Sequence, residues 1–412
     1  MAAANALVAA KQHLMKLQSR LHEEQERAKH LDETLNRLRS KSKPRLNYII
    51  RDGWLQTFES KLPVTHEEDP DDYDLGPCPW SSVYQTAGRR DEMSQVQGSY
   101  GVFECGSVKV ADSSTKFINL SSKVRLAKWV RKLQNTPFTI CPSSGWLRWD
   151  LEIENVEEFR KQITNEVEEG AEFLRDVSPT HPWVIKKDGA SGGNGIVFVS
   201  NLQQVKKALD EGRDLEEALP FLDDRRESIA NWAAQRHIDK PMLLMDGHKF
   251  HLRAYVVGVG NRVFHYSRFE VRVAPVKWES DFAVKGCHIT NGGGSDAHHE
   301  RRYLADQFPE LAPAVAKLPE YLRYIVTHCQ EPETAEVPDA SWTACAVMGL
   351  DIMVDVDYNL YLLEANHSPA APPFDELHRF GCHVRRFCQR LVRLLVIAPQ
   401  GGTVPGFNEI VI

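Results

Sequence analysis

One stretch of the chain constrains its fold more than any other: two short apolar runs, residues 183–186 and 196–199, flank a glycine-rich loop at 189–195. Each run has the length and composition of a buried strand, and a helix is expected directly afterwards, from 201 to 209. A strand, a loop, a strand and a helix in this order predict a fold of the α+β class, which mixes sheets with helices.

Other segments predict further strands and helices. Apolar residues alternate from Phe250 to Val256, as they do on a strand with one buried face. The further strands expected are 102–103, 108–110, 117–120, 262–266, 270–274, 351–356 and 360–365, and the further helices are 123–133, one within 155–174, and a basic one at 379–395. The last two strands, joined across 357–359, are expected to close the core.

Residues 1 to about 40 follow a heptad repeat, in which nine of the ten seam positions are apolar. The two seams are Leu7, Leu14, Leu21, Ala28 and Leu35, and Ala10, Leu17, Glu24, Leu31 and Leu38. Five heptads predict a long helix that packs on its own domain, pairs in a coiled coil with itself or a partner, or serves as an amphipathic presequence. Pro44 is expected to end it, because proline cannot continue a helix.

A chain of 412 residues is long enough for several domains. The boundaries expected are 1–43 for the heptad-repeat helix, 44–118 for a small N-terminal α/β domain, 119–240 and 241–400 for two larger subdomains, and 401–412 for a tail. Lysine and arginine number 50 against 57 aspartate and glutamate, a net charge of −7 that argues against a nucleic-acid coat. No apolar run approaches the roughly 18 residues of a membrane span, so neither nucleic acid nor membrane is expected as a partner.

Three residues in the last strand pair have the chemistry of a metal site. Glu364 and Asn366 are two positions apart on a strand and therefore point to the same face, and a hairpin partner can bring Asp351 beside them. Two carboxylates and an amide oxygen suit Mg²⁺, and an acid inside an apolar strand is costly unless it is paired or metal-bound. The alternative interpretation is that both acids form structural salt bridges.

Two basic elements indicate a site for an anion. Lys186 ends a buried strand beside the glycine loop, whose backbone N–H groups can approach a phosphate, although an ordinary glycine hairpin explains that loop equally well. Lys249, His251 and Arg253 share one face of a strand and would repel one another unless an anion lies across them. Between 248 and 285, seven Lys and Arg face three Asp and Glu, a basic stretch that a solvated surface would also explain.

Together, the loop, the basic strand and the acid–acid–amide cluster indicate nucleoside triphosphate chemistry with Mg²⁺. Their order along the chain resembles the tubulin–tyrosine ligase family, which belongs to the ATP-grasp superfamily. The matching segments are 183–186, 189–196, 235–243, 249–253, 288–291 and 349–351 through 364–369, within roughly 119–395. The resemblance implies an ATP-grasp fold with the nucleotide between two β-sheets, in which 119–240 is the central and 241–400 the C-terminal subdomain.

The resemblance also implies a role for each matching residue. The residues implied at the nucleotide are Lys186, Gly192, Gly193, Gly195, Gln235, Arg236, His237, Ile238, Lys249, His251, Thr290 and Asn291, the last two on the acceptor side. Arg253 and Arg272 would face the terminal phosphate and the phosphorylated carboxylate, and Lys123 matches a catalytic basic position less closely. Asp351, Glu364 and Asn366 would hold Mg²⁺.

The reaction that the resemblance implies is ATP-dependent amide formation. A carboxylate attacks the γ-phosphate of ATP to form an acyl phosphate, and the amino group of a free amino acid, tyrosine or glutamate, then displaces phosphate. The acceptors implied are the acidic C-terminal tails of tubulin, to which the basic stretch at 248–285 and the basic helix at 379–395 are complementary. A cytoplasmic, cytoskeleton-associated protein is expected accordingly.

Three positions depart from the family pattern. His251 stands where aspartate is usual, Lys187 replaces a proline, and Asn194 stands where the loop carries arginine. A neutral imidazole can hydrogen-bond a ribose hydroxyl but lacks a carboxylate's charge. These departures keep a second hypothesis open, a ligase-like pseudoenzyme that binds microtubules or a partner through its coiled coil and basic face. A third, an ATP-grasp enzyme that joins small molecules, is disfavoured by the order of the motifs.

Overall fold

The computed structural model describes most of the chain from Ser99 onward. The described residues are 49–50, 99–105, 108–113, 117, 119–120, 122–133, 136–148, 171–188, 190, 195–217, 231–280, 282, 285–290, 301–329, 343–367, 387, 390–391, 394–395 and 397–411. The predictions that lie outside these residues are the heptad-repeat helix, the loop residues Gly192, Gly193 and Asn194, Asn291, and most of the helices within 155–174 and 379–395.

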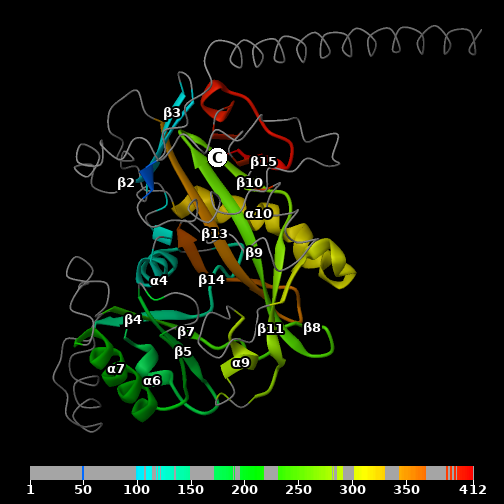
Figure 1. Cartoon of the computed structure of the whole chain (residues 1–412). Coiled ribbons are helices and arrows are strands. Elements are labelled where there is room, and N and C mark those ends of the chain that lie inside the picture. Colours follow the sequence, from blue (N-terminus) through cyan, green and yellow to red (C-terminus); the bar gives the residue numbers. More distant parts are fainter. Residues whose placement is uncertain are drawn as a thin grey trace, which may run out of the picture.

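Two β-sheets form the frame of the described structure (Figure 1). The smaller sheet has the strand order β4 (Ser144–Arg148), β7 (Asn231–Arg236), β5 (Trp183–Lys187) and β6 (Ile196–Val199), and every neighbouring pair is antiparallel. The glycine loop therefore joins two adjacent antiparallel strands, β5 and β6, as the sequence predicts.

The larger sheet is organised around two long antiparallel strands, β9 (His248–Val259) and β13 (Thr343–Val354). Next to them lie β10 (Arg262–Tyr266), β11 (Glu270–Lys277) and β14 (Leu360–His367), all antiparallel to their neighbours. The remaining strands of this sheet are β1 (Ile49–Ile50), β2 (Ser99–Cys105), β3 (Val108–Ser113), β8 (Leu243–Leu244), β12 (Arg301–Leu304) and β15 (Phe407–Ile410).

Helices cover one face of each sheet. The described helices are α4 (Lys123–Lys132), α6 (Phe173–Asp176), α7 (Leu202–Glu217), α9 (Lys285–His288) and α10 (Ala312–Cys329), with short 3-10 turns at 305–307, 309–311 and 398–400. Trp183 and Ile185 of β5 point into a core with α6 and α7, whereas Phe250 and Leu252 of β9 point into a core with α10. Because side chains alternate along a strand, the residues between them face the other way.

Most of the predicted elements are confirmed, with two differences. Phe117, Asn119 and Leu120 lie in 3-10 turns instead of a strand, because Phe117 and Leu120 are both buried at a spacing of three residues. The strand predicted to begin at Asp351 begins at Thr343, so Asp351 lies inside β13. The residues from Cys345 to Val354 are all buried and show no alternation that would mark where the strand starts.

The segment predicted as a small N-terminal domain contributes strands to the larger sheet. β3 pairs in parallel with β13, with Val110 opposite Thr343, and β2 pairs with β3. The domain boundaries derived from the sequence remain predictions.

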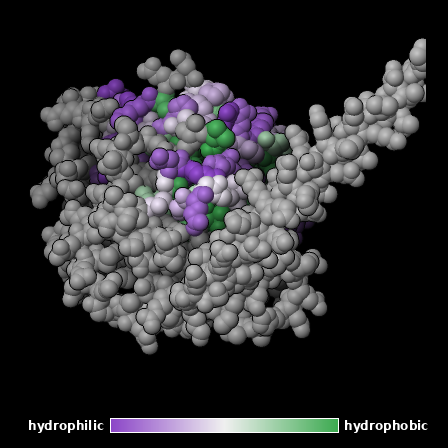
Figure 2. Space-filling view, turned by 90° about the horizontal axis from the view of Figure 1, so that it is seen from above, coloured by the Kyte–Doolittle hydropathy of each residue, from purple (hydrophilic) through white to green (hydrophobic). Residues whose placement is uncertain are grey.

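The described surface offers few apolar side chains to solvent. Seen from above, it is mostly hydrophilic with single apolar residues between (Figure 2). Val356 and Val411 are the large apolar residues of the described chain that are clearly exposed. None of the described helices combines the length and the apolar character that crossing a bilayer requires.

Candidate active site

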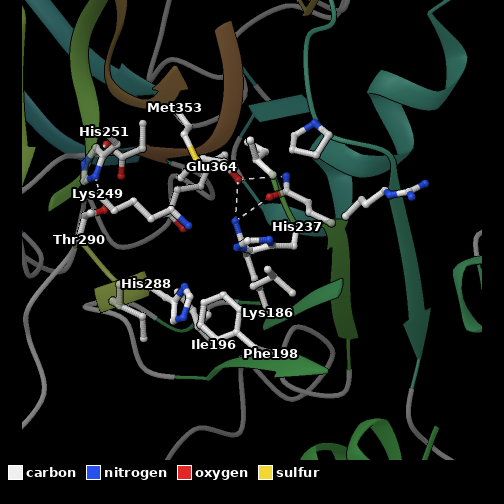
Figure 3. Close-up of a pocket in the computed structure, with 18 residues that line it drawn as sticks. Lys186, Ile196, Phe198, His237, Lys249, His251, His288, Thr290, Met353 and Glu364 are labelled. Atoms are coloured by element: carbon white, nitrogen blue, oxygen red, sulfur yellow. Dashed lines mark hydrogen bonds and ion pairs between the residues drawn. The ribbon is translucent and has the colours of Figure 1, made fainter. Parts of the chain in front are cut away.

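A pocket lies between the two sheets and takes its lining from both (Figure 3). The smaller sheet contributes Val184, Lys186, Ile196, Phe198, Gln235 and Arg236; the larger contributes Lys249, His251, Asp351, Met353, Leu363 and Glu364; Pro142, His237, Ile238, His288, Ile289 and Thr290 complete it. In Figure 3, Lys249, His251 and Thr290 lie on one side of this pocket, and Lys186 and His237 lie on the other. These are the strand faces that point away from the two helix-covered cores.

Lys186 ties the smaller sheet to the larger one. Its Nζ donates to Gln235 Oε1 at 2.7 Å and to the Leu363 carbonyl at 3.1 Å, and Gln235 Nε2 donates to the same carbonyl at 3.1 Å. The carbonyl is accessible because β14 bulges at this point: Asp351 pairs with Glu364, but Ile352 pairs with Leu362. Burial, above all other causes, lowers the pKa of Lys186.

Lys249 is a second buried lysine that reaches the pocket from the opposite sheet. Its residue is 3% exposed, and burial, with a contribution from nearby Lys186, lowers its pKa to about 8. Within the described part of the chain Lys249 has no ion-pair partner. A buried ammonium without a carboxylate is unfavourable unless an anion lies beside it, so the two lysines make this pocket suited to a phosphate or carboxylate ligand.

A buried polar network runs from β9 to β13 beside the pocket. Arg253 donates to both oxygens of Asp351, through Nη2 at 2.9 Å and through Nε. His251 joins the same carboxylate, with Nε2 lying 3.2 Å from Asp351 Oδ1, and its Nδ1 hydrogen-bonds Thr290 Oγ1. Burial of the Asp351 carboxyl by itself raises its pKa. The charge of Arg253, and after it that of His251, outweighs this effect and holds the pKa of Asp351 well below its usual range.

Glu364 and Asn366 lie next to Asp351, as the two-residue spacing predicts. Asn366 Nδ2 lies 3.3 Å from Glu364 Oε1 and 3.2 Å from Asp351 Oδ2. Lys123, at the start of α4, places its Nζ 3.8 Å from Glu364 Oε2 and donates to the Ala190 carbonyl at 2.7 Å. The predicted cluster of two acids and one amide therefore exists, with a lysine and an arginine around it.

The donor chemistry of this cluster fits Mg²⁺. Carboxylate and amide oxygens are its ligands, and Mg²⁺ usually needs only one or two carboxylates together with phosphate oxygens. Among the described residues, no group of three His, Cys, Asp or Glu side chains could hold a metal by itself. Arg253 donates to both oxygens of Asp351. Glu364 and Asn366 would therefore be better placed than Asp351 to hold the ion.

Arg272 lies one strand further from the pocket than Arg253. It pairs across the strands with His251, and its Nη2 donates to Glu270 Oε2 at 3.3 Å. Tyr255 donates through its hydroxyl to Glu270 Oε1 at 2.9 Å. The sequence analysis missed Glu270 and Tyr255, although the two-residue spacing of Glu270 and Arg272 on a strand was a signal that they share a face.

Most of the predicted site residues come together. Lys186, Gln235, Arg236, His237, Ile238, Lys249, His251, Thr290, Asp351 and Glu364 line the pocket, and Arg253, Asn366 and Lys123 contact its carboxylates. Gly195 lies in the β5–β6 loop with φ of +67°, where a Cβ atom would be 2.7 Å from Lys187 Cβ, so the position requires glycine. The sequence analysis missed the apolar lining of Val184, Ile196, Phe198 and Met353, which alternation along the strands could have revealed.

Two mainly antiparallel sheets with a cationic pocket and an acid–amide cluster between them define an ATP-grasp-like class of protein. Residues 111–305 match the family model described as the Tubulin-tyrosine ligase family. It is 23% identical over 267 residues to the human "Inactive polyglycylase TTLL10", which covers 58% of this chain and 38% of that protein. It is 24% identical over 211 residues to "Tubulin glycylase 3C" of Tetrahymena thermophila, which covers 46% of this chain and 18% of that protein. The matches thus span well under half of these relatives' own lengths.

Proposed function

We propose that this chain is an ATP-dependent ligase that joins a free amino acid to a protein carboxylate, with ATP and Mg²⁺ between the two sheets. The observation that carries the proposal is the meeting of two buried lysines from opposite sheets, Lys186 and Lys249, beside the cluster of Glu364 and Asn366. A triphosphate with its metal requires two features in one pocket. One is a set of cations that the protein's own acids do not neutralise, and the other is an acid–amide pair that can hold the metal.

The chain's own residues would divide the work of such a reaction. Lys186 and Lys249 bind phosphate oxygens, while the apolar lining excludes water from the reacting groups. Glu364 and Asn366 would hold Mg²⁺, which would neutralise charge on the transferring phosphoryl group. Arg253, Arg272 and Lys123 add positive charge around the terminal phosphate and the acceptor carboxylate. The carboxylate attacks the γ-phosphorus and ADP leaves, which gives the acyl phosphate. The amino group then attacks the acyl carbon, phosphate leaves, and the amide forms.

The acceptor we propose is an acidic protein tail, first of all that of tubulin. Support comes from the family and from the names of the relatives, one a tubulin glycylase and one an inactive polyglycylase. A cytoskeletal location would follow from this acceptor. The amino acid is tyrosine or glutamate in the sequence-based hypothesis, and the glycylase names add glycine to the panel that has to be tested.

The experiment is a ligation assay with the full chain, Mg²⁺ and a peptide of the tubulin C-terminal tail. Radiolabelled tyrosine, glutamate and glycine are offered one at a time, and ADP release and peptide mass are measured together. A mass increase that requires both ATP and Mg²⁺ supports the ligase. ADP release without any peptide product would mean that the acceptor is another carboxylate.

A ligase-like pseudoenzyme is the second candidate, and the environment of Asp351 favours it. His251 occupies the family's aspartate position and lies against Asp351, whose oxygens Arg253 also engages. A relative of this chain is named an inactive polyglycylase. In that case the same assay gives no ADP and no product, while cosedimentation with microtubules persists.

A further inference from the structure

Every charged side chain on α4, the helix that begins beside the pocket, is basic. α4 packs on β4 of the smaller sheet and lies near β14 of the larger one (Figure 1). Its first residue, Lys123, reaches Glu364 and the Ala190 carbonyl. The ten residues of α4 include no Asp or Glu, and its basic residues are Lys123, Arg125, Lys128, Arg131 and Lys132. Positive charge therefore extends along the helix, starting at the pocket.

Three of these cations lie on one face of α4. Arg125, Lys128 and Lys132 follow one another at intervals of three and four residues, which is the spacing of neighbours on a helix surface. All three are exposed, whereas the buried residues of α4 are Val124, Leu126, Ala127 and Trp129. We call Arg125, Lys128 and Lys132 the basic stripe. From Lys123 to Lys132 the helix rises by about 14 Å, since each residue adds about 1.5 Å.

The protein's own acids do not neutralise the basic stripe. Within the part of the chain that the structure describes, none of its three side chains has an ion-pair partner. Arg131 on the same helix differs, because its Nη1 and Nη2 donate to the two carboxylate oxygens of Glu172 at 2.7 and 2.5 Å. The stripe therefore presents three exposed charges that a partner from outside can reach.

The basic stripe is unfavourable for the stability of α4. Like charges three or four residues apart on a helix repel each other, and Lys128 has Arg125 on one side and Lys132 on the other. Arg125 also lies in the first turn, where the helix dipole favours acidic side chains, and α4 has none there. Negative charges bound along the stripe would offset this repulsion, so the arrangement indicates a partner with several acidic groups.

Lys128, in the middle of the stripe, is held in part by an aromatic ring. Its Nζ lies 5.4 Å from the centroid of the Trp146 ring, a cation–π contact with a residue of β4 that is 6% exposed. The contact limits the positions that the long side chain can adopt. Because Lys128 is nevertheless exposed, its ammonium group can also contact a partner.

We propose that the basic stripe of α4 binds acidic side chains of the acceptor protein, next to the carboxylate that enters the pocket. The inference rests on the proposed function, since it takes the acceptor to be an acidic chain, and it adds the surface that recognises the residues around the acceptor position. An extended peptide advances about 3.3 Å per residue, so the rise of about 14 Å along α4 spans about four residues. Acidic residues within about four positions on one side of the acceptor should therefore contribute to binding.

The test measures peptide binding to the full chain without nucleotide, by fluorescence anisotropy. The probe is a fluorescein-labelled peptide with a central acceptor glutamate and further glutamates on both sides, and the control peptide has glutamine at every flanking position. The wild-type protein should bind the glutamate peptide about tenfold more tightly than the control. The combined variant Arg125→Gln, Lys128→Gln and Lys132→Gln should lose about tenfold in affinity for the glutamate peptide and nothing for the control, since three exposed ion pairs of modest strength are removed.

A matched variant removes the same net charge from other helices. Lys207→Gln on α7, combined with Lys317→Gln and Arg323→Gln on α10, also replaces three exposed cations and should lose less than about twofold in affinity for the glutamate peptide. Equal losses in the two combined variants would overturn the proposal, because the overall charge of the protein would then explain binding. Replacing the peptide glutamates one at a time should weaken binding only within about four positions on one side of the acceptor.

The outcomes separate this proposal from the proposed function. Peptide binding that depends on the basic stripe, without any ATP turnover, would overturn the ligase and leave the docking surface established. Ligation with the same KM for the glutamate peptide in the wild-type protein and in the stripe variant would overturn the docking surface and leave the ligase established. Tighter binding of a single-stranded DNA of equal charge than of the glutamate peptide would also overturn the proposal, since phosphates would then be the preferred partner.

Discussion

Arg253 donates two hydrogen bonds from its guanidinium to the two carboxylate oxygens of Asp351 on the neighbouring strand. Both residues are at least 95% buried. Removing one member of such a pair leaves an uncompensated charge in the interior, which is strongly destabilising. The pair with Arg253 therefore gives Asp351 a role in stabilising the fold, in addition to the metal-binding role that the sequence predicts.

Asp351→Asn should lower the free energy of unfolding by about 3–5 kcal/mol at neutral pH, because it leaves Arg253 buried without its counter-ion. Denaturant unfolding followed by circular dichroism measures this. Because the pKa of Asp351 is depressed, its contribution is present above the ordinary aspartate value of about 3.9 and is lost as pH falls through the folded-state pKa. Asp351→Asn should lack this part of the decrease in unfolding free energy at acid pH. Equal stability of the two proteins at pH 7 would contradict a stabilising role for the Arg253–Asp351 pair.

Glu364→Gln should abolish ATP turnover while changing the unfolding free energy by less than about 1 kcal/mol. The amide keeps the shape of Glu364 but removes a charge that would bind Mg²⁺ in the pocket. The measurement is ADP release across a Mg²⁺ titration, with denaturant unfolding alongside. Asp210→Asn, at an acid of α7 paired with Lys206 away from the pocket lining, is the matched control. Turnover at the wild-type rate in Glu364→Gln would refute the metal assignment.

ATP affinity should fall as pH rises through about 8, where the Lys249 ammonium loses its proton. The effect of pH on stability has the opposite sign. Between about pH 8 and 10, Lys249 is protonated in the unfolded chain but deprotonated in the folded chain, so the free energy of unfolding rises with pH. Lys249→Met should show neither dependence and should bind ATP weakly throughout. Lys249→Arg keeps its charge, so its ATP affinity should stay flat from pH 7 to 9. A pH dependence in Lys249→Met equal to that of the wild-type protein would assign the titration to another group.

Glu270→Gln should weaken ATP about tenfold and leave ADP affinity unchanged. Glu270 orients Arg272 through its Oε2, and Arg272 is expected at the terminal phosphate that ADP lacks. Calorimetric titrations with both nucleotides give the ratio. Tyr255→Phe, which removes the hydroxyl bonded to Oε1, should shift the ratio in the same direction by a smaller factor. Equal losses for ATP and ADP would mean that Glu270 supports the sheet and not the phosphate site.

The sequence was sufficient for the elements whose apolar residues alternate or stand between turn residues. β9 was visible from Phe250 to Val256, and β5 and β6 from the runs around the glycine loop. β13 was only half visible, because a strand buried on both faces shows no alternation. The extent of such a strand depends on its neighbours in the sheet, which local sequence does not reveal.

The sequence was likewise sufficient for only some of the contacts in the candidate site. That Glu364 and Asn366 share a face follows from the two-residue period of a strand, and Asp351 joined them as expected. The pairing of Tyr255 with Glu270 and of His251 with Thr290 depends on the register between distant segments. No pattern within one segment could have predicted these contacts, since each joins residues of two different segments, 15 and 39 positions apart along the chain.

The bulge in β14 has a consequence for how the pocket accepts a ligand. Lys186 has three N–H groups, and two of them are used within the described chain, by Gln235 and by the bulged carbonyl of Leu363. The third can serve an anion without breaking the other two. Because these two hydrogen bonds already hold the Lys186 side chain in place, little of its conformational freedom would be lost on binding the proposed nucleotide. Such preorganisation strengthens binding without any additional contact.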